Sequence, residues 1–209
     1  MDQVRERFRH LATGRRGYGT DRDGWVPEPA VRGDHSLMPG AVLDPGPHTP
    51  AAVLVPLVMH GAELTVLLTQ RTQHLADHPG QVAFPGGRVE PGDPDPIHTA
   101  LRETEEEVGL PPDHVSVIGR LDTYVTGTGY EITPIVGLVR APYPVHPDPF
   151  EVADVFEVPL AFVIDVRNHE RRSREVKGRT RNFYVLPFPG RYIWGATAGM
   201  LVNLAEVLG

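Results

Sequence analysis

Four glutamates stand close together between residues 103 and 107, and three of them share one face of a predicted helix. Glu103, Glu106 and Glu107 are spaced i, i+3 and i+4, which brings their carboxylates to the same side. Like charges at this spacing repel by roughly 0.2–0.5 kcal/mol per pair, so a surface helix gains nothing from them. A hard divalent cation removes the repulsion, because it takes carboxylate oxygens as ligands. The spacing therefore predicts a magnesium site and, with it, a phosphate-containing substrate.

The segment that holds these glutamates is predicted to be a helix over residues 96–108. Asp95 is a favourable N-cap, and Pro96 suits the first helical position. Gly109 is the expected C-cap, and two prolines directly afterwards prevent the helix from continuing. A long loop over residues 71–96, which carries the Gly86-Gly87 turn, precedes the helix. The predicted core face consists of Ile97, Ala100, Leu101, Thr104 and Val108.

Around this helix the sequence predicts one α+β domain. Apolar or alternating residues indicate strands at 51–59, 63–69, 115–121, 132–139, 154–158 and 182–186, and a closing helix at 195–208. Pro56 interrupts the first strand and predicts a bulge or an edge position. At the N-terminus, residues 2–12 form an expected amphipathic helix with Val4, Phe8 and Leu11 at helical spacing, and residues 14–50 an irregular arm. We therefore divide the chain into a helix and arm over residues 1–48 and a domain over residues 49–209.

The composition excludes several classes of protein. The 209 residues are 40% hydrophobic, which supports a globular fold. The absence of cysteine excludes disulfides, thiolate metal sites and a cysteine nucleophile. The net charge of −7 disfavours a general nucleic-acid binder. No apolar run approaches the roughly 18 residues of a membrane span, and the first 16 residues lack an apolar signal core, so we expect a cytoplasmic protein without a membrane contact. An exposed strand or the arm could support a homodimer.

The pattern Arg-Glu-x-x-Glu-Glu-x-Gly-aliphatic, which begins at Arg102 and follows a glycine turn, resembles the Nudix box. The resemblance implies an α/β/α sandwich with a mixed sheet and hydrolysis of a diphosphate linked to another moiety. It implies that the glutamates bind Mg²⁺ or Mn²⁺, and that Arg102 orients one of the carboxylates. Glu103 and Glu107 are the first two expected ligands, Glu106 binds a second ion or a water, and Gly87 matches the turn glycine.

The box departs from the usual pattern at three places. Thr104 replaces an aliphatic residue, and the interval from Gly87 to Arg102 is one residue longer than usual. Asp93 and Pro94 stand where an early glutamate is common, which puts the geometry of the loop in doubt more than the chemistry.

Residues 67–72 and 80–87, and later 157–160 and 192–197, resemble the coenzyme A pyrophosphatases, although some members have arginine at the position of Ala76. The resemblance covers roughly residues 50–205. It implies that coenzyme A or a derivative is cleaved to 3′,5′-ADP and a phosphopantetheine. Arg71, Gly86 and Gly87 are the expected substrate contacts, and a carbonyl of the glycine turn could complete the metal site. The general base is left open between Glu103 and Glu151.

Other functions compete with this one. The glutamate face could be a solvated acidic surface, but the glycine turn, the arginine and the C-cap glycine coincide with it at fixed offsets. A second possibility is a Nudix enzyme for ADP-ribose, NADH or another nucleoside diphosphate derivative. A third is a silent module that senses a nucleotide. Such modules commonly lose motif carboxylates, and all three are present here.

Further residues have both a structural and a functional interpretation. Arg71 could bind a substrate phosphate or pair with a loop carboxylate. His74 and His78 are expected to stabilise their loop, Trp194 to seat the last helix on the sheet, and residues 124–131 to form a loop near the site. A basic stretch could attract the 3′-phosphate of coenzyme A or form a solvated hairpin with Glu170 and Glu175 as partners; it comprises Arg167, Arg171, Arg172, Arg174, Lys177, Arg179 and Arg181.

Overall fold

The computed structural model describes residues 4–8, 30–38, 43, 46–75, 77–176 and 178–209. Its larger sheet is mixed and contains nine strands within these ranges, in the order β1-β7-β8-β2-β3-β4, with β5 and β2, β6 and β8, and β9 and β3 also paired. The strands are β1 (Val31–Gly33), β2 (Thr49–His60), β3 (Glu63–Arg71), β4 (Val82–Ala83), β5 (Gly86–Arg88), β6 (Val115–Arg120), β7 (Thr123–Val125), β8 (Tyr130–Arg140) and β9 (Val152–Pro159).

A second, smaller sheet is antiparallel and consists of β10 (Glu170–Val176), β11 (Arg179–Phe188) and β12 (Arg191–Trp194). The two long helices are α2 (Pro96–Val108) and α4 (Gly195–Leu208), and the short ones are η1 (Asp34–Leu37), η2 (Pro112–His114), α3 (Leu160–Ile164) and η3 (Val166–Asn168). No helix within the described ranges is long and apolar enough to cross a membrane.

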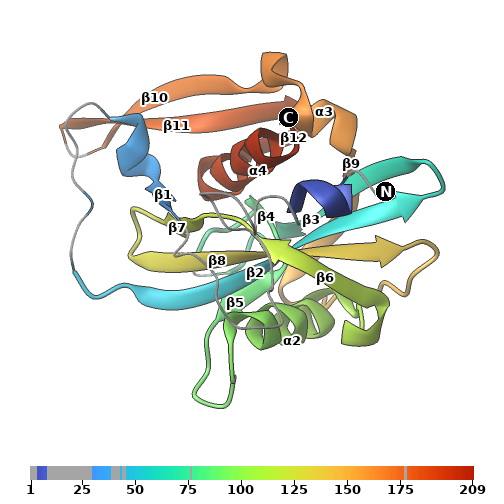
Figure 1. Cartoon of the computed structure of the whole chain (residues 1–209). Helices are drawn as coiled ribbons and strands as arrows, with labels where there is room; N and C mark the ends of the chain where they lie inside the picture. Colours follow the sequence, from blue (N-terminus) through green and yellow to red (C-terminus); the bar gives the residue numbers. More distant parts are fainter. Residues whose placement is uncertain (1–3, 9–29, 39–42, 44–45, 76, 177) are drawn as a thin grey trace.

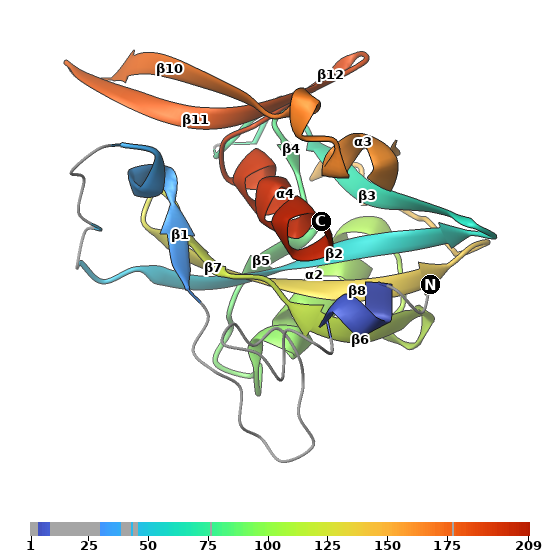
Figure 2. The ribbon, with the colours of Figure 1, turned by 45° about the horizontal axis from the view of Figure 1, so that its top comes forward.

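The large sheet lies between α2 on one face and α4 on the other, and the small sheet covers the far side of α4 (Figure 1, Figure 2). The α/β/α sandwich with a mixed sheet is therefore confirmed, with the small sheet as an additional layer. Each face has its own apolar core. Val53, Val55 and Leu57 of β2 belong to the cluster that contains Leu201 of α4. The alternate β2 residues Ala52, Leu54 and Val58 belong to the cluster that contains Ala100 and Val108 of α2.

The burial of β2 on both faces explains its nearly continuous apolar sequence. The expected bulge or edge at Pro56 is wrong, because β2 lies inside the sheet and pairs in register with β8 from Thr49 to Met59. On its other side β2 pairs with β5 at residues 51–53 and with β3 at residues 57–60. Pro56 falls in the gap between these two ladders, where its missing N–H removes no bond of either.

Two predictions on irregular segments also need correction. The arm over residues 14–50 contains β1 and η1, and β1 pairs in parallel with β7. The expected loop at residues 124–131 is a loop only at 126–129, since its ends belong to β7 and β8. Strand β1 forms because it meets β7, which lies about ninety residues later in the sequence, and no local pattern indicates this pairing. Residues 4–8 of the predicted N-terminal helix are helical and bury Phe8, whereas Leu11 lies outside the described residues. The division at residue 48 remains a prediction.

Candidate functional site

The helix α2 begins and ends where its capping residues predict. Asp95 is the N-cap, and its carboxylate accepts a hydrogen bond from the His98 N–H at 2.8 Å. Gly109 is left-handed, with φ of 69°, and its N–H donates to the Glu105 carbonyl at 2.9 Å. A left-handed C-cap is adopted at little conformational expense only by glycine. The observed caps confirm the predicted ends of the helix at Pro96 and Val108.

Glu107 points into the protein, where its side chain is only 8% exposed. Its carboxylate accepts a hydrogen bond from the Gly86 N–H at 3.1 Å and lies 3.7 Å from Nη1 of Arg71. Burial raises the pKa of Glu107 to about 7, although the Gly86 hydrogen bond and Arg71 act to lower it. A carboxylate buried with so little compensation is a ready ligand for a cation.

Glu103 lies one turn earlier and rests on the glycine turn. A Cβ atom on Gly87 would stand 2.4 Å from Cδ of Glu103, so only glycine leaves room for this carboxylate. Oε1 of Glu103 also lies 3.0 Å from Nη1 of Arg102. Burial raises the pKa of Glu103, an effect that Arg102 partly offsets. The glycine turn thus positions both carboxylates. The Gly86 N–H donates a hydrogen bond to Glu107, and Gly87, which has no side chain, leaves room for Glu103.

Asp93 takes the place of the early acidic residue that the sequence lacks. Its two carboxylate oxygens accept hydrogen bonds from Nε and Nη2 of Arg102 at 3.1 and 3.0 Å. It also accepts from the Glu90 N–H and the Thr99 hydroxyl. These bonds, with Arg102 first, hold the pKa of the Asp93 carboxyl well below its usual range. The departure in this loop therefore preserves an acid–arginine pair that orients Arg102 toward Glu103.

Glu106 is placed differently from the other two motif glutamates. Its side chain is 60% exposed and lies 3.1 Å from Nη1 of Arg102. It does not belong to the cavity lining that contains Glu103 and Glu107. The structure thus brings two of the three expected metal ligands together, and a part for Glu106 in metal binding remains a prediction.

The two inward glutamates open into a cavity of about 710 Å³. Its wall includes Arg71, Gly86 and Gly87, the three predicted substrate contacts, and Glu151. The Glu151 carboxylate is near enough to Glu103 and Glu107 to contribute to raising the pKa of both. Further wall residues come from η1, the loop 126–129, the start of β8, the small sheet and α4. They include Asp34, Thr126, Gly127, Thr128, Tyr130, Arg174, Arg181, Asn182, Phe183, Trp194 and Met200.

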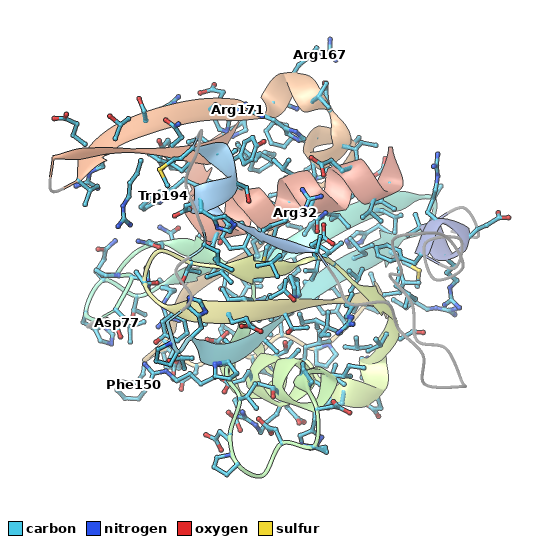
Figure 3. All side chains as sticks on the ribbon, turned by 60° about the vertical axis from the view of Figure 1, so that its left-hand side comes forward. Arg32, Asp77, Phe150, Arg167, Arg171 and Trp194 are labelled. Carbon is cyan, nitrogen blue, oxygen red and sulfur yellow. The ribbon has the colours of Figure 1, made fainter. Side chains whose placement is uncertain are left out.

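Several of these lining residues were absent from the sequence prediction. Asp34 lies in the arm and reaches the cavity because β1 joins the sheet, and no sequence signal could have found it. Trp194 was expected only to seat the last helix, but it also lines the cavity, with its ring edge-to-face to Phe183 at 5.5 Å (Figure 3). His78 is exposed and shares a hydrogen bond with Gln81 at 3.0 Å, which confirms a loop-stabilising histidine. Ala76 lies outside the described residues.

The donor set fits a divalent cation. No three His, Cys, Asp or Glu side chains within the described ranges already converge as a complete metal cage. Magnesium does not need one, because it keeps several waters and is commonly held by one or two carboxylates together with substrate phosphates. Glu103 and Glu107 supply two carboxylates on one cavity wall. Burial, which raises the pKa of each, disfavours the charged form, and a bound cation would stabilise that form.

The guanidinium of Arg71 is buried at Nε and lies near the carboxylate of Glu107. Its Nε is buried and has no hydrogen-bond partner among the described residues, while its Nη1 approaches Glu107. The expected alternative, a pair with a carboxylate of the protein, is found, but the partner is Glu107 of helix α2 and not a loop residue. The guanidinium therefore retains donors for an anion in the cavity.

Comparison with known proteins agrees with this arrangement. The NUDIX domain model matches residues 47–176. An uncharacterized Nudix hydrolase, NudL of Yersinia pestis, is 42% identical over 156 residues, which are 75% of this chain and 78% of that protein. NudL of Yersinia pseudotuberculosis matches to the same extent. Among solved structures, the Nudix hydrolase RenU of M. smegmatis aligns with a TM-score of 0.48 and 20% identity, over 91% of this chain and 94% of that one. The chain belongs to the Nudix hydrolase family.

Proposed function

We propose that this Nudix hydrolase cleaves the diphosphate bond of coenzyme A or its thioesters to 3′,5′-ADP and 4′-phosphopantetheine or its acyl form. One observation carries the proposal. The segment that resembles the coenzyme A pyrophosphatases does not lie on a remote surface, since Gln81, Phe84 and their neighbours line the cavity that contains Glu103 and Glu107. A signature that surrounds the reacting groups can contribute to substrate choice, whereas one on a distant loop cannot.

The carboxylates of Glu103 and Glu107 would hold the divalent cation, Mg²⁺ or Mn²⁺. When bound, the cation supplies charge neutralisation to the diphosphate oxygens and acidifies a water molecule. Arg71, which lines the cavity, donates from Nη1 to a phosphate oxygen and orients the diphosphate against the glycine turn. Asp93 and Arg102 act through Glu103, because they hold its carboxylate on Gly87.

Glu151 is the better placed of the two general-base candidates. Glu103 pairs with Arg102, and as a ligand of the cation it would be a weak base. Glu151 lines the same cavity from the loop before β9, and its backbone carbonyl accepts a hydrogen bond from the Thr72 N–H at 2.9 Å. In this role Glu151 takes the proton of the water as the water bonds to phosphorus and the bridging P–O bond breaks.

Product analysis tests the proposed function. The purified protein would be incubated with Mg²⁺ or Mn²⁺, or with EDTA, and separately with coenzyme A, dephospho-coenzyme A, ADP-ribose and NADH. We expect metal-dependent 3′,5′-ADP from coenzyme A, formed faster than any product of the other compounds. Faster cleavage of ADP-ribose or NADH would support diphosphate hydrolysis but contradict coenzyme A as the preferred substrate. No turnover with either metal would contradict the proposed function and favour the silent module. The cytoplasmic location and the homodimer remain predictions.

A further inference from the structure

Two arginines of the β10–β11 hairpin stand opposite each other without a counter-ion. Arg174 pairs with Arg181 in the antiparallel register, so the two side chains leave the same face of the hairpin. Like charges in directly opposite positions are destabilising. Neither arginine makes an ion pair or a side-chain hydrogen bond with another described residue. The pairing of these two arginines therefore does not stabilise the fold.

The neighbouring arginines on β10 are satisfied in a different way. Arg172 pairs with Glu170 at 2.6 Å, which confirms one of the two expected carboxylate partners. Arg171 donates to the Tyr184 hydroxyl at 3.1 Å and lies over its ring. Arg174 and Arg181 line the cavity, whereas Arg167, Arg171 and Arg172 do not. These two unpaired cations therefore face the site.

The tip of Arg181 is held at the rim by the loop between β7 and β8. A Cβ atom on Gly127 would stand 2.6 Å from Nη1 of Arg181, so the guanidinium packs directly on this glycine. Asp34 is the nearby acid, with Oδ2 at 3.6 Å from the same point. Its other oxygen accepts a hydrogen bond from the Tyr124 hydroxyl at 2.7 Å. Asp34 therefore lies near Arg181, but it forms no ion pair with Arg181 or Arg174, so the positive charge of the two arginines is not neutralised.

The two arginines are separated from the motif glutamates by the large sheet. Helix α2 lies under one face of that sheet, and the β10–β11 hairpin lies beyond the other face, above α4 (Figure 1, Figure 2). The cavity connects both regions. Phe183, two residues from Arg181, lines it on the hairpin side together with Trp194, which Figure 3 labels. An elongated ligand can therefore place one anionic group at Glu103 and Glu107 with a metal, and a second at the arginines.

We propose that Arg174 and Arg181 form a second anion subsite that binds a ribose phosphate monoester, remote from the bond that is cleaved. Phe183 and Trp194 offer the attached base an aromatic surface. This inference rests on the proposed function for its substrate, because the adenosine 3′-phosphate of coenzyme A supplies such a monoester. Arginine suits the task, since its planar fork donates two parallel hydrogen bonds to a phosphate.

A binding measurement tests the subsite without turnover. The full chain, in EDTA and about 0.15 M salt, would be titrated calorimetrically with adenosine 3′,5′-bisphosphate and with AMP, which lacks the 3′-phosphate. We expect the wild type to bind the bisphosphate ~10-fold more tightly, equivalent to about 1.4 kcal/mol. The double variant Arg174→Gln, Arg181→Gln should bind both nucleotides equally.

The matched control is Arg167→Gln, Arg171→Gln, which removes the same charge from the same region outside the cavity (Figure 3). It should keep the wild-type ratio. Equal affinities in the wild type, or a ratio retained in the Arg174 and Arg181 variant, would overturn the subsite. The ratio of kcat/KM for coenzyme A over dephospho-coenzyme A should fall in parallel.

The two proposals fail separately. Cleavage of coenzyme A without a preference for the bisphosphate would leave the proposed function standing and reject the subsite. An arginine-dependent preference for the bisphosphate, without cleavage of coenzyme A, would support the subsite and reject the proposed substrate.

Discussion

Replacement of Glu107 by glutamine should stabilise the metal-free protein at neutral and alkaline pH while it removes metal-dependent turnover. Burial raises the pKa of Glu107 from its ordinary value of 4.5 to about 7. The folded state therefore binds more protons than the unfolded state between these values, and unfolding becomes easier as pH rises. The contribution of Glu107 to stability is fully present below pH 4.5 and is lost as pH rises through about 7.

The size of the effect follows from the difference between the two pKa values. At ~1.4 kcal/mol for each tenfold change in the ionisation constant, ionised Glu107 destabilises the metal-free fold by about 3 kcal/mol at pH 8. At pH 5 the same linkage leaves less than about 1 kcal/mol, because most folded molecules keep the proton. Glutamine carries no charge at either pH, and its side-chain oxygen can still accept the Gly86 N–H. The stability of Glu107→Gln relative to wild type should therefore increase by about 2–3 kcal/mol from pH 5 to pH 8.

Urea denaturation in EDTA at pH 5 and pH 8 measures this change, with circular dichroism as the signal. Comparison of two pH values removes any constant effect of the amide on packing. Glu105→Gln is the matched control, because it removes a carboxylate from an exposed position of the same helix. Addition of Mg²⁺ should stabilise the wild type more than Glu107→Gln. A stability difference that is the same at both pH values would refute the electrostatic reasoning, and unchanged turnover of Glu107→Gln would refute the assignment as a metal ligand.

The remaining predictions concern the groups around Glu107. Glu151→Gln should lower kcat by about 10²–10⁴-fold if Glu151 is the general base, and a nearly unchanged kcat would transfer that role to Glu103. Gly87→Ala should lower kcat/KM by ~10²-fold, since its Cβ displaces Glu103 and a shift of ~1 Å is sufficient; an active variant would show that the Glu103 carboxylate can move freely. Asp93→Ala should lower activity by about 10–100-fold through Arg102, with Asp93→Glu retaining most of it; equal losses in both variants would argue against an orienting pair.

The helix that carries the motif could be predicted almost to the residue, because its signals are local. The backbone groups at the helix ends are satisfied locally. Asp95 accepts a hydrogen bond from a first-turn N–H, Pro96 has no N–H to satisfy, and the Gly109 N–H bonds to a carbonyl of the last turn. The strands β2, β3, β6, β8 and β9 also follow from their own apolar pattern, to within a few residues at each end. The strands β1, β4, β5, β7 and β12 did not. Each has only two to four residues, which is too short for an apolar pattern of its own, and β1 and β5 pair only with segments distant in the sequence.

By itself, the sequence determined the family, the helix and the residue types of the site, since these depend on spacing along one chain. Only the tertiary structure decided which carboxylates face the cavity. Glu103 and Glu107 turn toward the glycine strand β5, whereas Glu106 stays outside with Arg102. It also decided that Arg174 and Arg181 reach the same cavity. Helical spacing defines which residues share a face, but only packing of that face against the sheet defines which of them are buried, and therefore which have raised pKa values and can hold a cation.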